Sequence, residues 1–295
     1  MGGTCGAMLA ASRWRLPMRP GALREGDEFP DARMTAPLSV SDMVKEAWGL
    51  ASRAALPALP WLALWWLSGG VYKWALTGAA GGTGLALVAL AALFAAGVQA
   101  SLSIYKAMMP GTAGGFLPLA HANLAVYLAF GFIGFFVLFF TGAFGVMMLQ
   151  LSGVVDLAAE PTDADVQAGL KAVLATPYGA ALVLVFGAGM GGLCWLALRL
   201  TLIGAATVQA GQARVFRTWG RTKGLTLPLG LAALFTHVAP FLLGGAANTA
   251  LTELIGKADW ARFSSGVTGF VLLTPFVLAG HGLAVAALRR LAPAA

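Results

Sequence analysis

The sequence predicts an all-α integral membrane protein with six transmembrane helices and in-plane amphipathic helices before the first and fifth spans. The first observation is composition, since 59% of the 295 residues are hydrophobic and only 11% are charged, whereas soluble proteins carry about 25% charged residues. The second is a mean hydropathy of +0.80. The third is a series of six apolar runs, each near or above the roughly 20 residues that cross a bilayer as a helix.

Residues 1–38 are predicted to be a disordered basic extension, followed by a transmembrane domain over residues 39–295. The extension contains five arginines and four acids, and its apolar patch at residues 8–11 is too short for a signal-peptide core. Met34 is followed at once by a helical pattern. We therefore hypothesise that translation starts at Met34, and intact-mass measurement of the native protein would test this.

The stretch SVSDMVKEAWGLASR, residues 39–53, is predicted to be an amphipathic helix. Its apolar residues recur with the spacing of one helical face, and Ser39 with Asp42 resembles a capping pair. The stretch is too polar to span the bilayer. We expect it to lie in the membrane surface, with Trp48 among the lipid headgroups and Arg53 facing anionic lipid.

The six predicted spans alternate with short polar segments. They cover residues 55–76, 85–104, 124–151, 178–198, 225–243 and 265–288. Pro57 and Pro60 fall in the first turns of the first span, where proline is tolerated. Between the third and fourth spans, Asp163 and Asp165 predict the start of a short outer helix, because acids favour helix N-termini.

The positions of Lys and Arg predict the orientation of the chain. With a cytoplasmic N-terminus, the inner segments 1–54, 105–123, 199–224 and 289–295 carry 15 basic residues and the outer segments carry 4. Leaving out residues 1–33 still gives 10 against 4. The excess predicts that both termini are cytoplasmic.

A basic and aromatic cluster precedes the fifth span in VFRTWGRTKGLTLP, residues 215–228. Its predicted lipid-headgroup contacts, with a neighbouring arginine, are Arg214, Arg217, Trp219, Arg221 and Lys223. On a surface helix the three arginines would form one stripe at i, i+3 and i+7. Each juxtamembrane basic residue contributes about 1 kcal/mol of attraction to an anionic leaflet.

The first and fifth spans share an entry motif, AWGLASRAALP and TWGRTKGLTLP. In both, nine positions separate the Trp of Trp-Gly from the Pro of Leu-Pro, and a basic residue lies between. The two copies are either ordinary anchors that fix the orientation of the chain or parts of a duplicated unit. Parallel repeats of the second kind occur in transporters.

The segment RLTLIGAATVQAGQARVFRTWGRTKG, residues 199–224, resembles bacterial polytopic proteins related to the membrane domain of glycerophosphodiester phosphodiesterases. The opening SDMVKEAWGLASR and the six-span plan also fit, so that the resemblance covers about residues 39–290. It implies a bacterial inner-membrane protein with six helices and no settled activity. We do not extend the phosphodiesterase activity to this chain, because the sequence has no cluster of His and Glu to bind its metal.

Two intramembrane histidines, His237 and His281, form the one predicted polar site inside the spans. Counted from their cytoplasmic ends they lie at different depths, so pairing requires tilt or a kink at Pro240 or Pro275. Either each neutral histidine hydrogen-bonds a neighbouring helix, or the two belong to a proton or ion relay. No Asp or Glu lies inside the predicted spans to complete a relay.

Other sequence patterns offer little chemistry. Zinc-binding HExxH, nucleophile-elbow and nucleotide-binding motifs are absent, and Cys5 and Cys194 lie far apart. We therefore expect no metal, no cofactor and no catalytic residue, and no nucleic-acid partner. Gly187 and Gly191 have the small-xxx-small spacing that predicts close helix packing.

Three functional hypotheses follow. The leading one is a non-enzymatic protein of the bacterial cytoplasmic membrane with a structural or interaction role, whose partners are anionic lipid and either its own copies or another membrane protein. The second is a small-solute transporter with His237 and His281 near the path. The third, a lipid-related membrane enzyme, rests on the resemblance alone. A cavity lined by acids, histidines or a metal would favour an enzyme, and loss of flux in histidine variants would favour a transporter.

Overall fold

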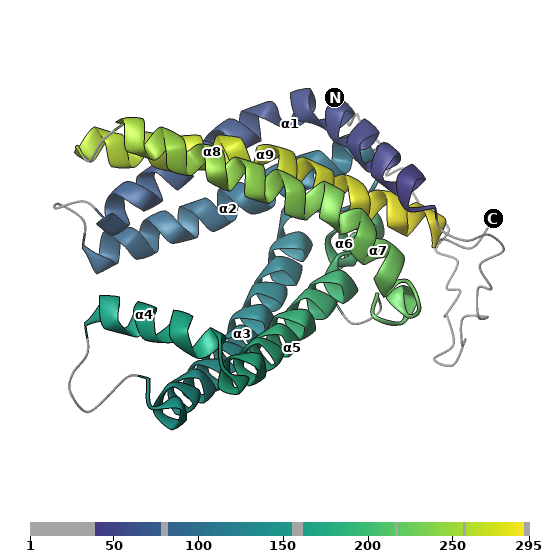
Figure 1. Ribbon diagram of the computed structural model, residues 1–295. Helices are drawn as coiled ribbons and strands as arrows, with labels where there is room; N and C mark the ends of the chain where they lie inside the picture. The colour runs from purple at the N-terminus through teal and green to yellow at the C-terminus, as the bar shows by residue number, and fades with distance from the viewer. Residues whose placement is uncertain (1–38, 78–81, 155–161, 216–217, 256–257, 292–295) are drawn as a thin grey trace, which may run out of the picture. The chain divides into compact units, whose positions relative to one another are not determined.

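The computed structural model describes residues 39–77, 82–154, 162–215, 218–255 and 258–291. Every regular element in these residues is a helix (Figure 1). Six helical stretches are long and apolar enough to cross a membrane: Val40–Thr77, Thr83–Met108, Phe116–Ser152, Pro177–Ala210, Thr226–Ile255 and Asp259–Arg290. The all-helical class and the six helices of spanning length are thereby confirmed, and they are compatible with a multi-pass membrane protein. The predicted extension, with Met34, lies outside the described residues.

Helix α1 (Val40–Thr77) joins the predicted surface helix and the first span without a break. The predicted capping pair is present, since the backbone N–H of Asp42 donates to the hydroxyl of Ser39 over 3.3 Å. Pro57 and Pro60 lie inside the helix, and Figure 1 shows α1 bending part-way along its length. Proline removes a backbone hydrogen bond and crowds the preceding turn, which accounts for a bend. An in-plane orientation of residues 40–53 stays a prediction.

Helices α1 and α9 (Asp259–Arg290) form an antiparallel pair with very close backbones. A Cβ on Gly266 would lie 2.8 Å from the Cα of Gly70, and a Cβ on Gly282 would collide with the carbonyl oxygen of Ala47. Residues near the start of α9 meet residues late in α1, and residues near the end of α9 meet residues early in α1, so the two helices are antiparallel. Because Gly266 and Gly282 have no side chain, the backbones of α1 and α9 can approach this closely, as at small-residue interfaces in membranes.

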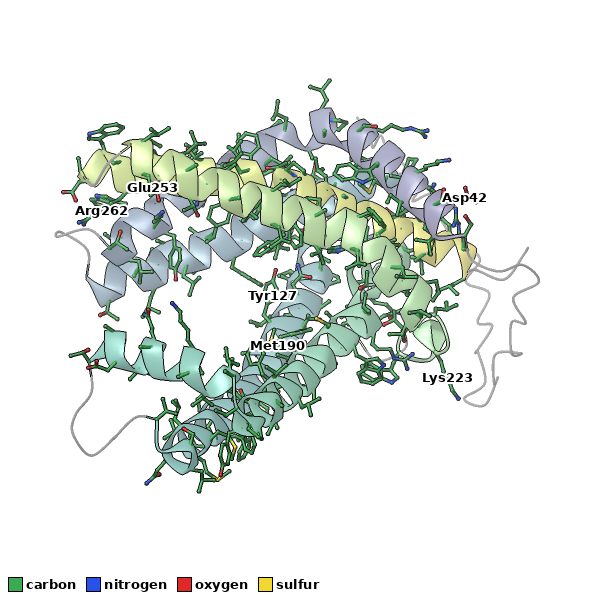
Figure 2. All side chains as sticks on the ribbon, in the orientation of Figure 1. Asp42, Tyr127, Met190, Lys223, Glu253 and Arg262 are labelled. Atoms are coloured by element: carbon green, nitrogen blue, oxygen red, sulfur yellow. The ribbon has the colours of Figure 1, made fainter. Side chains whose placement is uncertain are left out.

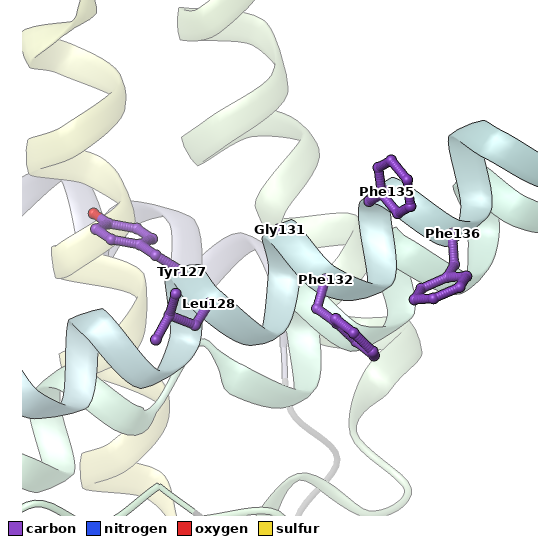
Figure 3. Close-up of a pocket in the computed structure, with 6 residues that line it drawn as sticks. All are labelled: Tyr127, Leu128, Gly131, Phe132, Phe135 and Phe136. Atoms are coloured by element: carbon purple, nitrogen blue, oxygen red, sulfur yellow. The ribbon is translucent and has the colours of Figure 1, made fainter.

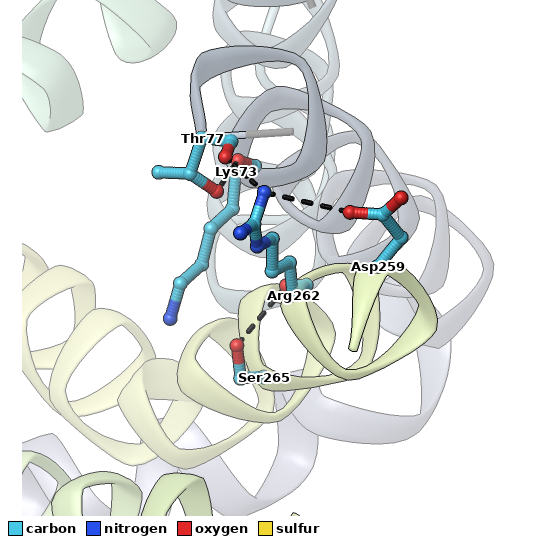
Figure 4. Close-up of polar contacts among 5 residues, drawn as sticks. All are labelled: Lys73, Thr77, Asp259, Arg262 and Ser265. Atoms are coloured by element: carbon cyan, nitrogen blue, oxygen red, sulfur yellow. Dashed lines mark hydrogen bonds and ion pairs between the residues drawn. The ribbon is translucent and has the colours of Figure 1, made fainter. Parts of the chain in front are cut away.

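Polar contacts join the two ends of this pair. At one end, the carboxylate of Glu46 accepts a hydrogen bond from Arg290 (2.9 Å) and lies 3.6 Å from the guanidinium of Arg289. At the other end, Arg262 donates to the backbone carbonyl of Thr77 and pairs with Asp259 over 3.4 Å (Figure 4). The start of α1 thus meets the end of α9, and the end of α1 meets the start of α9.

The buried core is formed mainly by α1, α2 (Thr83–Met108), α6 (Ile203–Ala210), α7 (Thr226–Ala233) and α9. Leu62, Ile104, Leu202, Leu229 and Leu283 are each at most 1% exposed. In contrast, the most apolar windows of α3 (Phe116–Ser152) and of the span Pro177–Ala210 contain no buried residue. Such exposure of Phe and Leu side chains is compatible with contact to lipid.

Helices α3 and α5 (Pro177–Leu200) pack against each other. A Cβ on Gly189 would approach Val137 to 2.8 Å, whereas Gly187 and Gly191 have nothing within 4 Å. The predicted packing role of Gly187 and Gly191 is therefore wrong for the described chain. Gly189 approaches α3 because it lies two positions away, on a different face of α5.

The predicted short helix at Asp163 is confirmed as α4 (Asp163–Leu174), and its location outside the membrane stays a prediction. Thr162 caps it, since its hydroxyl accepts from the backbone N–H of Asp165 and the carboxylate of Asp165 accepts from the backbone N–H of Thr162 over 2.9 Å. This reciprocal pair is the capping box that stabilises helix N-termini.

The fifth span contains a π-helical turn. It comprises α7, the turn η3 (Leu234–Val238) and α8 (Ala239–Ile255), and the backbone N–H of Ala239 donates to the carbonyl of Leu234. Pro240 follows at once and has no N–H for the carbonyl four residues earlier. The missing bond explains why the ladder widens here, as π-turns do within α-helices.

The prediction of an amphipathic helix before the fifth span is wrong for the described residues. Residues 211–215 and 218–225 form turns and one short 3-10 helix, η2 (Gly220–Thr222). Gly211 (φ +70°) ends α6 and Gly224 (φ +78°) precedes the span, both in the left-handed conformation that glycine adopts without strain. The hydroxyls of Thr218 and Thr222 bond local carbonyls instead of supporting a helix.

Candidate functional site

The linker between α5 and α7 begins with a buried short helix that sequence reasoning missed. In α6, Thr207 and Val208 are fully buried, and Val208 lies so close to Gly114 that a Cβ there would meet its Cα at 2.6 Å. Gly204 lies against the hydroxyl of Tyr105 in α2. The run LIGAATVQA is too short to be recognised as a separate helix in the sequence, so only the tertiary packing reveals it.

Arg199, in the last turn of α5, lies beside two tryptophan rings that contact each other. Its guanidinium carbon is 4.7 Å from the ring centroid of Trp219 and 5.6 Å from that of Trp195. The two rings meet edge to face at 5.4 Å. Only 7% of Arg199 is exposed, so this arrangement, the Arg199 cage, holds a largely desolvated cation by cation–π attraction.

The Arg199 cage has no counterion among the described residues. The three ion pairs found there involve Glu46 and Asp259, not Arg199, and the buried Nε of Arg199 has no hydrogen-bond partner. The C-terminal end of a helix dipole stabilises a cation by about 0.3–1 kcal/mol. An unpartnered buried charged group costs more than this, typically above 1–3 kcal/mol.

A second buried arginine nitrogen lies on the linker that follows α5. The Nε of Arg214 also has no partner among the described residues, and its backbone N–H donates to the hydroxyl of Thr207 over 3.2 Å. Lys223 is exposed and its side chain extends away from the helices (Figure 2). The linker therefore carries two described cations, Arg214 and Lys223, that form no ion pair with a described acidic residue.

The predicted lipid contacts have different surroundings. Trp48 is 38% exposed and Arg53 is exposed, both on α1, whereas Trp219 is partly buried in the Arg199 cage. Arg217 lies outside the described residues, and the backbone of Arg221 belongs to η2. Because residues 211–215 and 218–225 are not α-helical, the predicted stripe of Arg214, Arg217 and Arg221 does not form as a helical face.

The two entry motifs have different backbones. The first, with Trp48, lies inside the continuous helix α1. The second, with Trp219, passes through η2, an extended Lys223 and the left-handed Gly224. The two copies therefore do not share one backbone conformation, which contradicts a duplicated structural unit in the described residues.

The histidines lie closer than their predicted depths suggested. The Nε2 of His237, in the π-turn, would be 2.7 Å from a Cβ on Gly280, the residue before His281. The Nδ1 of His237 bonds the hydroxyl of Thr236 over 2.9 Å, and Nδ1 of His281 donates to the carbonyl of Val277 over 2.7 Å. These partners lie on each histidine's own helical span, so the predicted bonds to neighbouring helices are absent from the described contacts.

His281 has a defined tautomer. A carbonyl oxygen only accepts, so the proton sits on Nδ1 and the Nε2 of the neutral ring is an acceptor. Its ring contacts Tyr105 of α2 at 4.5 Å between centroids, while His237 contacts Phe276 at 5.4 Å. The two histidines thus face partly aromatic surroundings at the junction of α2, η3 and α9.

Two open grooves lie elsewhere, on α3. The first is lined by Tyr127, Leu128, Gly131, Phe132, Phe135 and Phe136 (Figure 3). The second lies between α3 and α5, beside Gly189. Both are almost wholly apolar and neither contains a histidine or an acid. In the searched part of the chain, no three His, Cys, Asp or Glu residues gather as metal ligands would.

Comparisons of the chain with protein-family models, with curated proteins and with solved structures find no match. The resemblance inferred from residues 199–224 therefore stays an expectation. Any functional conclusion depends on the arrangement of this chain's own residues.

Proposed function

We propose that the chain is a multi-pass protein of a bacterial cytoplasmic membrane, with both termini in the cytoplasm. Its role is structural or interaction-based rather than enzymatic, and its cytoplasmic face contacts anionic lipid through the linker between α5 and α7. The supporting observation is that the four segments predicted to be cytoplasmic contact one another at one end of the helices.

These contacts join four parts of the chain. Glu46 near the start of α1 meets Arg289 and Arg290 at the end of α9, and Arg289 donates to the carbonyl of Met108 at the end of α2 over 2.7 Å. The α2–α3 connection and α6 meet where Gly114 lies against Val208. These segments therefore lie on one side of the molecule. This agrees with the positive-inside rule, which places the excess of basic residues in the cytoplasm.

Single-cysteine labelling in intact cells tests the orientation. After replacement of the native cysteines by serine, Lys223→Cys and Lys171→Cys would each carry one exposed thiol, on the linker and on α4. A membrane-impermeant maleimide is expected to label Lys171→Cys from outside and Lys223→Cys only after permeabilisation. The reverse pattern would reject the proposed topology.

Charge removal at exposed positions tests the lipid contact. Arg53→Gln and Lys223→Gln each remove one cation, and about 1 kcal/mol of attraction per cation corresponds to roughly fivefold weaker retention of phosphatidylglycerol. The loss should shrink at high salt, which screens exposed charges. Unchanged retention in the double variant would reject a contact through these two exposed side chains.

A small-solute transporter is the second candidate. It is supported by His237 lying within a π-turn, a feature frequent at functional sites, and packing against Gly280 next to His281. Ionisable residues inside membrane spans are rare and often mark substrate or ion pathways. In an uptake or growth screen, His237→Ala and His281→Ala should abolish flux of a solute while the protein still folds, and parental behaviour of both variants would reject this candidate.

A further inference from the structure

The Arg199 cage, made of Arg199, Trp195 and Trp219, presents a cation whose partner must come from outside the described chain. Arg199 is more than nine-tenths buried and its Nε is unpartnered. Burial keeps water away from this nitrogen, whereas the terminal N–H groups of Arg199 are not among the buried, unpartnered atoms. A ligand that brings negative charge would remove this imbalance.

The geometry of the cage limits what that ligand can be. The tryptophan rings lie near the guanidinium at 4.7 and 5.6 Å, which restricts where a ligand can approach and leaves its N–H donors as the recognition groups. These donors form a planar fork that matches two oxygens of a phosphate or carboxylate. Tryptophans at the end of a spanning helix are typical of the headgroup level, where phosphate is the abundant anion.

Further cations on the linker that carries Trp219 favour a phosphate with net negative charge. The buried Nε of Arg214 is also unpartnered, and Lys223, four residues after Trp219, is exposed. Among the described residues on this side, the carboxylate of Glu46 is already engaged by Arg289 and Arg290. A zwitterionic headgroup would bring its own cation to an already positive linker, whereas a phosphatidylglycerol headgroup or free phosphate would not.

We propose that the Arg199 cage is a phosphate-binding site, occupied by the phosphate of an anionic lipid headgroup or by a soluble phosphate. This deepens the proposed lipid contact, on which it rests for the supply of the lipid, by assigning one specific site. Arg199 supplies the hydrogen bonds, and Trp195 and Trp219 orient its guanidinium. Binding here differs from diffuse attraction to Lys223, because it depends on the planar shape of the arginine group.

The decisive comparison is Arg199→Lys against Lys223→Gln. Arg199→Lys keeps the charge but removes the fork, whereas Lys223→Gln removes an exposed charge and leaves the cage intact. The full-length chain in a neutral detergent would be titrated with phosphatidylglycerol and with phosphatidylcholine, and the bound lipids counted by native mass spectrometry. Arg199→Lys is expected to weaken the first phosphatidylglycerol about tenfold or more, with phosphatidylcholine unchanged. Lys223→Gln should weaken it by no more than about fivefold.

A second variant protects the test against misfolding. Trp219→Phe keeps an aromatic ring with a weaker cation–π face, and it should weaken the first phosphatidylglycerol several-fold, about as the loss of one such contact predicts. Helical content and gel-filtration profile would verify folding of each variant. Parental affinity in both folded Arg199→Lys and Trp219→Phe would overturn the proposal and leave the cage as packing alone. A folded Trp219→Phe with parental affinity would do the same if Arg199→Lys failed to fold.

Inorganic phosphate distinguishes the two sources. If millimolar phosphate displaces the first phosphatidylglycerol from the parent chain but not from Arg199→Lys, the site accepts soluble phosphate. If it does not, while the variants behave as expected, the site is specific to the lipid headgroup. Detergent-solubilised protein has no inner or outer side, so a reversed labelling pattern would reject the topology without affecting this result.

Discussion

The carboxylate of Glu46 accepts a hydrogen bond from Arg290 over 2.9 Å, which ties the start of α1 to the end of α9. Both side chains are about three-tenths exposed, so solvent screens the pair only in part. Measuring the strength of this contact would show whether α1 and α9 pair in the folded protein.

Breaking this pair should lower stability modestly. Glu46→Gln and Arg290→Gln are each expected to reduce the free energy of unfolding by about 1 kcal/mol, as for partly exposed ion pairs. The coupling energy of the double variant, measured by unfolding in detergent, should be about 0.5–1 kcal/mol. Strictly additive effects would mean that the two residues do not interact.

Because α1 packs closely against α9, the stability cost of replacing a glycine by alanine should depend strongly on whether that glycine lies at their interface. Gly282→Ala should destabilise the protein by about 1–3 kcal/mol, because the new methyl group would meet the backbone of Ala47. Gly49→Ala is the matched control on α1, since nothing lies within 4 Å of its Cβ position. It should be neutral or up to about 1 kcal/mol stabilising through helix propensity. Equal effects at both positions would contradict this packing.

A hydrogen bond between spans gives a third prediction. The indole N–H of Trp66 donates to the hydroxyl of Thr274 over 2.9 Å, and Thr274→Val would leave that N–H without its partner. We expect a loss of about 1 kcal/mol beyond that of Thr268→Val. Thr268 is a suitable control because its hydroxyl bonds only the carbonyl of Ser264 on its own helix.

The cap of α4 should respond to acid. Hydrogen bonds from the side chain and then the backbone of Thr162 hold the pKa of the Asp165 carboxyl below its ordinary value. A lowered folded-state pKa means that this contribution to stability is fully present above the ordinary carboxyl pKa and is lost as the pH falls through the lowered value. NMR titration should find the depressed pKa in the parent chain and a more ordinary one in Thr162→Ala.

The spanning helices were predictable because hydropathy alone specifies them. In lipid every backbone group must bond within its own segment, so long apolar runs become helices whatever their neighbours. The start of α4 at Asp163 was predictable for a similar reason, since acids near a helix N-terminus act locally, whereas the role of Thr162 as its cap came only from the structure. The spans and this helix start are both local properties of the chain.

The linker and the Arg199 cage depend on distant contacts and were not predictable. The arginine spacing at 214, 217 and 221 suggested a helical stripe, but glycines at 211 and 224 and buried Thr207 favour turns in the described part. Trp195 and Trp219 come together only when α5 ends beside the linker. Nothing in the sequence near Arg199 indicates that its side chain is buried beside Trp219.

The pairing of α1 with α9 has a consequence for synthesis. A ribosome delivers the helices in order, so the first span enters the bilayer before its glycine-matched neighbour exists. Until the last helix is made, the face of α1 at Gly70 lacks the α9 side chains that cover it in the folded protein. Nascent chains stopped after α8 should therefore be prime targets for quality-control proteases.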